Sequence, residues 1–209
     1  MRLKKYLFLL VVAMLWNCTT NFDKKADLIS IDQKWRNGDL LGAKADVEKY
    51  LDTKNDNEYA WTLLGHIESD LGEDALAGVA YEKATSINPN TVEAITGLGI
   101  ISRKNGEYDR ASEYYNKAIE IDPNYAEAYS SLVAIYLKRK KFKEAVDAGL
   151  KGYNLSKDND VIAANLAVAY HYYNDTIQRN KFYEIAKKNG YKNIETMKLI
   201  FDGELTIFD

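Results

Sequence analysis

The chain has 209 residues, of which 46% are hydrophobic and 28% charged, and its formal net charge is −3. These proportions are ordinary for a folded protein and exclude a largely disordered chain. A mildly acidic chain also lacks the basic balance of nucleic-acid-binding proteins, so we expect no nucleic acid among its partners.

The segment 1–17 has the pattern of a targeting segment. Residues 2–5 carry three basic side chains, and an almost wholly apolar run follows from Tyr6 to Trp16. A charged start and a short apolar core are typical of a signal peptide, whereas a membrane span needs roughly 20 apolar residues. We therefore expect a signal peptide at residues 1–17.

Cys18 follows the apolar run directly and is the only cysteine, so no disulfide can form within the chain. With Leu15 three residues before it, this segment resembles the lipobox of bacterial lipoproteins, although Asn17 stands where a small residue is usual. The resemblance implies cleavage before Cys18, lipid on its thiol and a lipid-attached linker over residues 18–23. It also implies a bacterial cell envelope, with the periplasmic side of the outer membrane as the expected location. The alternative is a plain signal peptide or an uncleaved anchor with an incidental cysteine.

The rest of the chain is internally repetitive. Three glycines are separated by a constant step of 34 (72−38 and 106−72), as are four alanines and the only two prolines. The positions are Gly38, Gly72 and Gly106; Ala43, Ala77, Ala111 and Ala145; and Pro89 and Pro123. So many coincidences at one period indicate a repeat protein.

The residues between these positions resemble the tetratricopeptide repeat, whose period is 34. The unit at residues 58–91 matches best, through Trp61, Leu64, Gly65, Ala77, Tyr81 and Pro89, although Glu68 replaces an aromatic residue. The units are expected at about 24–57, 58–91, 92–125, 126–159 and 160–193. The outer ones match less well, as the terminal repeats of a solenoid do.

The resemblance implies an all-α, right-handed superhelical solenoid of antiparallel helix pairs, with about five repeats over residues 24–193. Glycines at 72 and 106 should end the first helix of a pair, since glycine adopts the left-handed conformation found just past helix ends. The prolines should end the second helix. Apolar residues at helical spacing predict a capping helix over residues 194–201, within a segment 194–209. The apolar tail Leu205–Phe208 is expected either to fold back or to stay free.

The repeat at 126–159 is unusual because Gly149 stands where Tyr81 and Tyr115 stand in two other units, and Gly152 replaces an alanine. Glycine inside a helix costs roughly 1 kcal/mol relative to alanine. One hypothesis is that Tyr170 or Tyr173 packs onto the bare backbone. The alternative is simple drift at a tolerant repeat.

Catalytic patterns are absent from the sequence. His66 and His171 are the only histidines, and they belong to non-adjacent units, so we expect no metal site. Neither a phosphate-binding loop nor a nucleophile motif occurs. We therefore expect no enzyme, no catalytic residues and no cofactor.

The remaining prediction is a binding surface. In the tetratricopeptide family the first helices of successive units line a groove that takes a peptide or helix. The resemblance implies that this groove contains Tyr59, Thr62, His66, Glu93, Thr96, Arg103, Glu127, Ser130, Lys138, His171 and Tyr172. We expect a membrane-anchored lipoprotein scaffold, an adaptor for protein or peptide partners in an envelope complex. The alternatives are a ligand-binding or transporter-associated lipoprotein and a surface-exposed lipoprotein that binds external partners.

Overall fold

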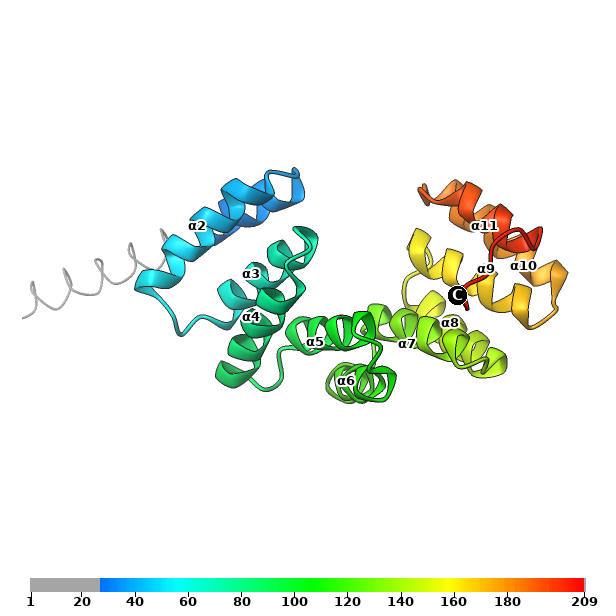
Figure 1. The fold of residues 1–209 in the computed structure, drawn as a ribbon, viewed down its shortest axis with the longest axis horizontal. Helices are drawn as coiled ribbons and strands as arrows, with labels where there is room; N and C mark the ends of the chain where they lie inside the picture. The colour runs from blue at the N-terminus through cyan, green and yellow to red at the C-terminus, as the bar shows by residue number, and fades with distance from the viewer. Residues whose placement is uncertain (1–26, 209) are drawn as a thin grey trace, which may run out of the picture. The chain divides into compact units, whose positions relative to one another are not determined.

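The computed structural model describes residues 27–208, and every regular element in that range is an α-helix (Figure 1). Residues 27–36 form the first described helix. The others are α2 (Leu40–Thr53), α3 (Glu58–Asp70), α4 (Asp74–Ile87), α5 (Val92–Lys104), α6 (Tyr108–Ile121), α7 (Ala126–Lys138), α8 (Phe142–Leu155), α9 (Asp160–Tyr172), α10 (Thr176–Lys188) and α11 (Ile194–Phe201). The predicted all-α helical-repeat solenoid is confirmed for this part of the chain.

The helices keep the period of the sequence. The first helices of four pairs begin at Glu58, Val92, Ala126 and Asp160, which is a constant step of 34 (92−58, 126−92 and 160−126). Their second helices begin at Asp74, Tyr108, Phe142 and Thr176, with the same step (108−74, 142−108 and 176−142). Because only three residues separate the helices of each pair, the two must run antiparallel and pack closely against each other.

The turn inside each pair needs one residue with positive φ, because the chain must reverse just past a helix end. Gly38, Gly72 and Gly106 have φ of 85°, 79° and 80° at this position. The prediction that glycines 72 and 106 end their helices is thus confirmed. The next two turns use Lys140 at 56° and Asn174 at 63°, so the backbone geometry continues where the glycine does not.

Prolines end the second helices as predicted. Helix α4 stops at Ile87 and α6 stops at Ile121, each two residues before a proline. The intervening Asn88 and Asp122 are extended, which is the conformation that a following proline imposes.

The chain divides into two compact units, up to Pro89 and from Asn90 onward. Unit 1 contains the helix 27–36 and α2–α4, and Ala43, Val47, Ala60 and Ile67 are fully buried in its core. Unit 2 contains α5–α11, with a larger core that includes the fully buried Ile95 and Leu166. In unit 2 the pairs stack so that the first helices α5, α7 and α9 lie next to one another, and α11 packs on α9 (Figure 1).

Glycine and tyrosine form a matched pair inside two of the repeats. A Cβ on Gly65 would lie 2.5 Å from Cε1 of Tyr81, and a Cβ on Gly99 would lie 2.5 Å from Cε1 of Tyr115. The missing side chain on the first helix therefore makes room for the ring on the second. These glycines are packing residues.

The hypothesis that Tyr170 or Tyr173 covers Gly149 and Gly152 is wrong. The atoms nearest to a Cβ on Gly149 are Leu166 Cδ1 at 2.7 Å, Leu166 Cβ at 3.5 Å and Val133 Cγ2 at 3.5 Å. Gly152 is covered by the backbone of Ala126, by Tyr129 and by Ile162. Branched aliphatic side chains fill the space because they point at the glycines from α7 and α9, whereas Tyr170 stacks on Phe182 of α10.

Helix α11 covers the end of unit 2 with Met197 and Ile200, which are buried against the core. Its eight residues coincide with the expected capping helix at 194–201. Among the residues that the structure describes, no helix is long and apolar enough to cross a membrane.

Candidate partner-binding site

A half-enclosed pocket lies on the face of unit 2 formed by the first helices of its three repeats. It has a volume of about 260 Å³ and is closed on one side by α11 and the tail. Arg103 from the end of α5 and Lys138 from the end of α7 both line it, so the fold brings together two residues that the sequence analysis assigned to a groove. We call this cavity the basic pocket.

The rest of the basic pocket is apolar with a few polar groups. Aliphatic side chains form most of the wall: Ala134, Leu137, Val168, Met197, Ile200 and Ile207. Tyr108, Tyr191, Asn165, Asn193 and Thr196 add hydroxyl and amide groups, and no carboxylate is among the described lining residues. Asn165 is oriented by its amide, which donates to Ser130 Oγ at 3.0 Å. A mostly apolar wall with a few convergent polar groups is the usual composition of a binding site.

Most of these lining residues were missed by the sequence analysis. Those on α11 and the tail lie outside the repeats, so a family groove pattern does not include them. The amphipathic pattern of residues 194–201 predicted a covering helix. Which of its side chains line the pocket depends on the packing of α11 against α9, which the sequence pattern does not give.

His171 and Tyr172, expected at the far end of the groove, belong to an aromatic cluster beside the basic pocket. Tyr172 stacks on Phe142 with ring centroids 5.6 Å apart, and the His171 ring centroid lies 5.1 Å from that of Phe201. Burial lowers the pKa of His171, and the nearby Arg179 guanidinium lowers it further. The neutral form of the imidazole is therefore favoured, and the ring serves as a packing group.

The tail folds back onto this cluster, which decides between the two expectations for residues 205–208. The ring centroid of Phe208 lies 5.0 Å from that of Tyr172 and 6.3 Å from that of Phe142. Ile207 lines the basic pocket.

Thr62, Thr96 and Ser130, which share one repeat position, do not line an accessible groove. Their exposed fractions are 4%, 4% and 7%, and Ala164 at the next equivalent position is exposed by 1%. The expectation is wrong for these three because this position faces the neighbouring helices. Ser130 on α7, for example, accepts a hydrogen bond from the Asn165 amide on α9 at 3.0 Å, whereas Thr62 donates its hydroxyl within its own helix, to the carbonyl of Glu58 at 2.7 Å.

Glu93 and Glu127 are exposed and lie outside the basic pocket. They are close enough to Tyr125 to act on its phenol: burial raises the pKa of Tyr125, and the two carboxylates raise it further. These residues form an acidic edge on the first turns of α5 and α7.

The remaining predicted residues lie in unit 1. Tyr59 is half exposed, and His66 is part of a packed stack. Trp35 stacks on His66 with ring centroids 5.4 Å apart and planes 8° apart, while His66 Nδ1 is 2.9 Å from Tyr81 Oη. Trp35 Nε1 donates to Asp70 at 2.7 Å. His66 thus joins the first two helix pairs of unit 1.

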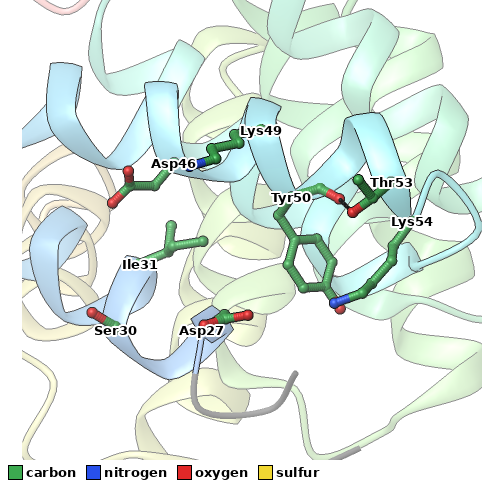
Figure 2. Close-up of a pocket in the computed structure, with 8 residues that line it drawn as sticks. All are labelled: Asp27, Ser30, Ile31, Asp46, Lys49, Tyr50, Thr53 and Lys54. Atoms are coloured by element: carbon green, nitrogen blue, oxygen red, sulfur yellow. Dashed lines mark hydrogen bonds between the residues drawn. The ribbon is translucent and has the colours of Figure 1, made fainter. Parts of the chain in front are cut away.

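Unit 1 also has an opening between its first two helices, with a volume of about 400 Å³ (Figure 2). Its lining carries charges of both signs, with Asp27, Asp46, Lys49 and Lys54 around Tyr50. Lys54 already lies over the Tyr50 ring, 4.4 Å from its centroid. Asp46 is already paired with Lys34, whose Nζ lies 2.5 Å from its carboxylate, so the Asp46 and Lys54 charges of this opening are engaged within unit 1.

The described residues carry no group of three or more His, Cys, Asp or Glu side chains placed to hold a metal ion. Cys18, the signal peptide and the lipid-attached linker of the sequence analysis lie outside residues 27–208. The expected lipid site therefore stays a prediction.

The paired helices, their constant spacing and the stacking of first helices define a helical repeat protein. Three family models described as tetratricopeptide repeat match residues 58–91, 92–125 and 114–147. Residues 58–147 therefore match tetratricopeptide repeats, and proteins built from this repeat are generally non-enzymatic interaction scaffolds. A search of curated proteins found no match.

Solved structures share the fold. PilF of Pseudomonas aeruginosa is 18% identical with a TM-score of 0.71, and the match covers 87% of this chain and 85% of PilF. TTC0263, a thermophilic tetratricopeptide repeat protein of Thermus thermophilus, is 16% identical with a TM-score of 0.71, over 86% and 97% of the two chains. YrrB, described as having an unusual peptide-binding site, is 17% identical with a TM-score of 0.57, over 84% and 89%. At these identities the likeness shows the fold alone.

Proposed function

We propose that this protein is a non-catalytic scaffold that binds peptide segments of protein partners in the basic pocket. The observation that carries the proposal is the pocket itself, to which three successive repeats and α11 contribute side chains. Solenoids present extended binding surfaces of this kind because each repeat adds one helix to the same face.

The size and lining of the pocket favour a peptide over a small free ligand. About 260 Å³ is below the roughly 300–1,000 Å³ of pockets that enclose drug-sized ligands. It suits one or two side chains of a longer segment that continues outside. The peptide-binding site named for YrrB, a protein of the same fold, is in keeping with this use.

The charge of the pocket indicates the sign of the partner. Arg103 and Lys138 are the charged residues of the described lining, so the segment should carry a carboxylate next to its apolar side chains. Guanidinium groups bind carboxylates through paired hydrogen bonds, which gives Arg103 the larger share in specificity.

Crosslinking in cells tests the proposal. A photoreactive residue replaces Thr196 at the pocket or, as a control, the exposed Glu113 on α6. We expect discrete protein adducts from position 196 and none of the same size from 113. The double reversal Arg103→Glu/Lys138→Glu should abolish these adducts, whereas Lys117→Glu/Lys143→Glu, which makes the same change of net charge at exposed positions, should not. Adducts that survive the first pair would refute this binding mode.

We further propose that lipid on Cys18 holds the scaffold at a bacterial envelope membrane. The lipobox-like segment before Cys18 supports this proposal. Firm anchoring would raise the local concentration of the scaffold and so strengthen weak binding. Replacing Cys18 by alanine should release the protein from membranes and remove the mass of the lipid. Unchanged membrane retention would contradict a lipid anchor. Protease digestion of intact cells then separates a periplasmic adaptor from a surface lipoprotein that meets external partners.

A further inference from the structure

The last described residues are turned back toward α8 and α9 by the end of α11. Gly203 has φ of 76°, a conformation open to glycine but strained for other residues. The backbone amides of Glu204 and Leu205 both donate to the carbonyl of Leu199, at 2.9 Å and 3.1 Å. This closed turn sends residues 206–208 across the end of α9.

Two side chains of the tail occupy the binding face. Ile207 is part of the wall of the basic pocket, and its amide lies 3.5 Å from Tyr172 Oη. Phe208 lies against the rings of Tyr172 and Phe142, at centroid distances of 5.0 Å and 6.3 Å. The tail thus places an aliphatic and an aromatic side chain, in that order, where a partner segment would bind.

The tail is held weakly. Within the described part of the chain no helix or strand continues past Phe201. Residues 206–208 make the long hydrogen bond to Tyr172 and a local one from the amide of Phe208 to Thr206 Oγ1 at 3.2 Å. The tail otherwise packs through rings and aliphatic groups, and Leu205 stays 43% exposed. A short segment held by so few hydrogen bonds opens at low cost in free energy.

Lys140 connects the tail to the repeat architecture. It occupies the positive-φ position that three earlier turns give to glycine, and its ammonium lies over the Phe208 ring, 5.1 Å from the centroid. Strained backbone of this kind tends to be kept where the side chain serves a site. Here the side chain contributes a cation–π contact to the Phe208 ring.

We propose that residues 206–208 are an internal ligand of the basic pocket, displaced by a partner segment of the same chemistry. That segment has an aliphatic side chain, then an aromatic one, with a carboxylate close by for the basic groups. In the sequence, Asp209 follows Phe208, so this segment of the chain has the same composition. The proposal rests on the scaffold function above and adds to it the identity of the ligand class and a competitor built into the chain.

A peptide with the sequence of residues 203–209, labelled at its amino end, is the probe. Its binding is measured by fluorescence anisotropy to the purified full chain, to the chain ending at Glu204, and to Ile207→Ser/Phe208→Ser. If the tail occupies the pocket about nine-tenths of the time, removing it lowers the apparent Kd about tenfold. Leu205→Ser is the matched control, because it removes an exposed tail side chain and should leave the Kd at the wild-type value.

Equal affinity in all chains, or no binding of the probe to any of them, would overturn the proposal. The double serine variant keeps the chain length and should melt within a few degrees of the wild type, so a folding defect of the shortened chain does not decide the result. A probe with serine at positions 207 and 208 should not bind; if it binds as well as the original, the proposed ligand chemistry is wrong.

The crosslinker at position 196 separates this proposal from the scaffold function. We expect stronger partner adducts in the shortened chain than in the full one. Adducts of equal strength in both would end the internal-ligand proposal and leave the scaffold standing. Absence of adducts in both would count against the scaffold function, while the anisotropy result would still decide whether the tail competes for the pocket.

Discussion

Val133 on α7 lies against Gly149 on α8, so in this repeat the larger residue is on the first helix and the glycine is on the second. Two other repeats have the reverse order at the same positions. There the first helix carries Gly65 or Gly99 and the second carries Tyr81 or Tyr115. In the repeat at 126–159 the valine is on the first helix, and its Cγ2 lies 3.5 Å from the Cβ position of the glycine. The same space between helices is filled from the opposite side, with Leu166 completing it.

This exchange predicts strong coupling between the two positions. Gly149→Tyr alone should lower the free energy of unfolding by more than about 2 kcal/mol, because the ring meets Val133 and Leu166 in a filled core. Adding Val133→Gly should recover at least about 1 kcal/mol by restoring the glycine–tyrosine pair. Urea unfolding of the wild type, both single variants and the double variant gives the coupling energy. Additive effects would show that the two residues do not share the space.

The turn residue Lys140 predicts a stabilising substitution. A non-glycine residue in the left-handed region costs roughly 1–2 kcal/mol, so Lys140→Gly should raise the free energy of unfolding. Part of this gain is offset because the substitution also removes the contact between Lys140 and Phe208. The net gain expected is about 1 kcal/mol. Asn174→Gly is the matched comparison, and its gain should be smaller because asparagine tolerates this conformation better. A loss of stability in Lys140→Gly would mean that the tail contact outweighs the strain.

A buried carboxylate in unit 1 predicts a pH dependence. Glu68 is 5% exposed, its Oε1 is 3.5 Å from Lys44 Nζ, and Lys44 also pairs with Glu73. Burial raises the pKa of Glu68, although Lys44 opposes the shift. Because the folded pKa is above the ordinary value of 4.5, stability contributed by this group is present below pH 4.5 and is lost as the pH rises through the folded pKa.

The measurement is the free energy of unfolding of the wild type and Glu68→Gln in urea from pH 4 to pH 7. The wild type should lose stability relative to Glu68→Gln as the pH rises, since glutamine has no proton to lose. A constant difference across the range would mean that the folded-state pKa of Glu68 is not raised. Glu58→Gln, which removes a partly exposed carboxylate from the first turn of the same helix, serves as the control.

His171 predicts the opposite slope in unit 2. Its pKa is lowered by burial and by Arg179, so the stability it contributes is present above the ordinary value of 6.5 and is lost as the pH falls through the folded pKa. Between pH 7 and pH 5 the wild type should therefore lose stability relative to His171→Gln. Urea unfolding at fixed pH values measures this. Parallel curves for the two proteins would refute a lowered pKa.

The repeat architecture can be predicted from the amino-acid sequence, because each of its signals is local. A glycine that permits positive φ ends a helix wherever it stands, as at Gly72 and Gly106, and a proline ends the next, as at Pro89 and Pro123. The helices begin at intervals of 34 residues because these glycines and prolines recur at that interval. Local signals also sufficed for the helix at 194–201, whose apolar residues recur at helical spacing.

Tertiary structure alone decided the site. The family pattern assigns one repeat position, occupied by Thr62, Thr96 and Ser130, to the groove. Packing against neighbouring helices nevertheless buries these three residues. Arg103 and Lys138 converge only because α5 and α7 lie next to each other. Ile207 reaches the same pocket because Gly203 reverses the chain, and the space beside Gly149 is filled from two other helices. These are contacts between residues distant in sequence, and they depend on which surfaces meet once the helices are packed.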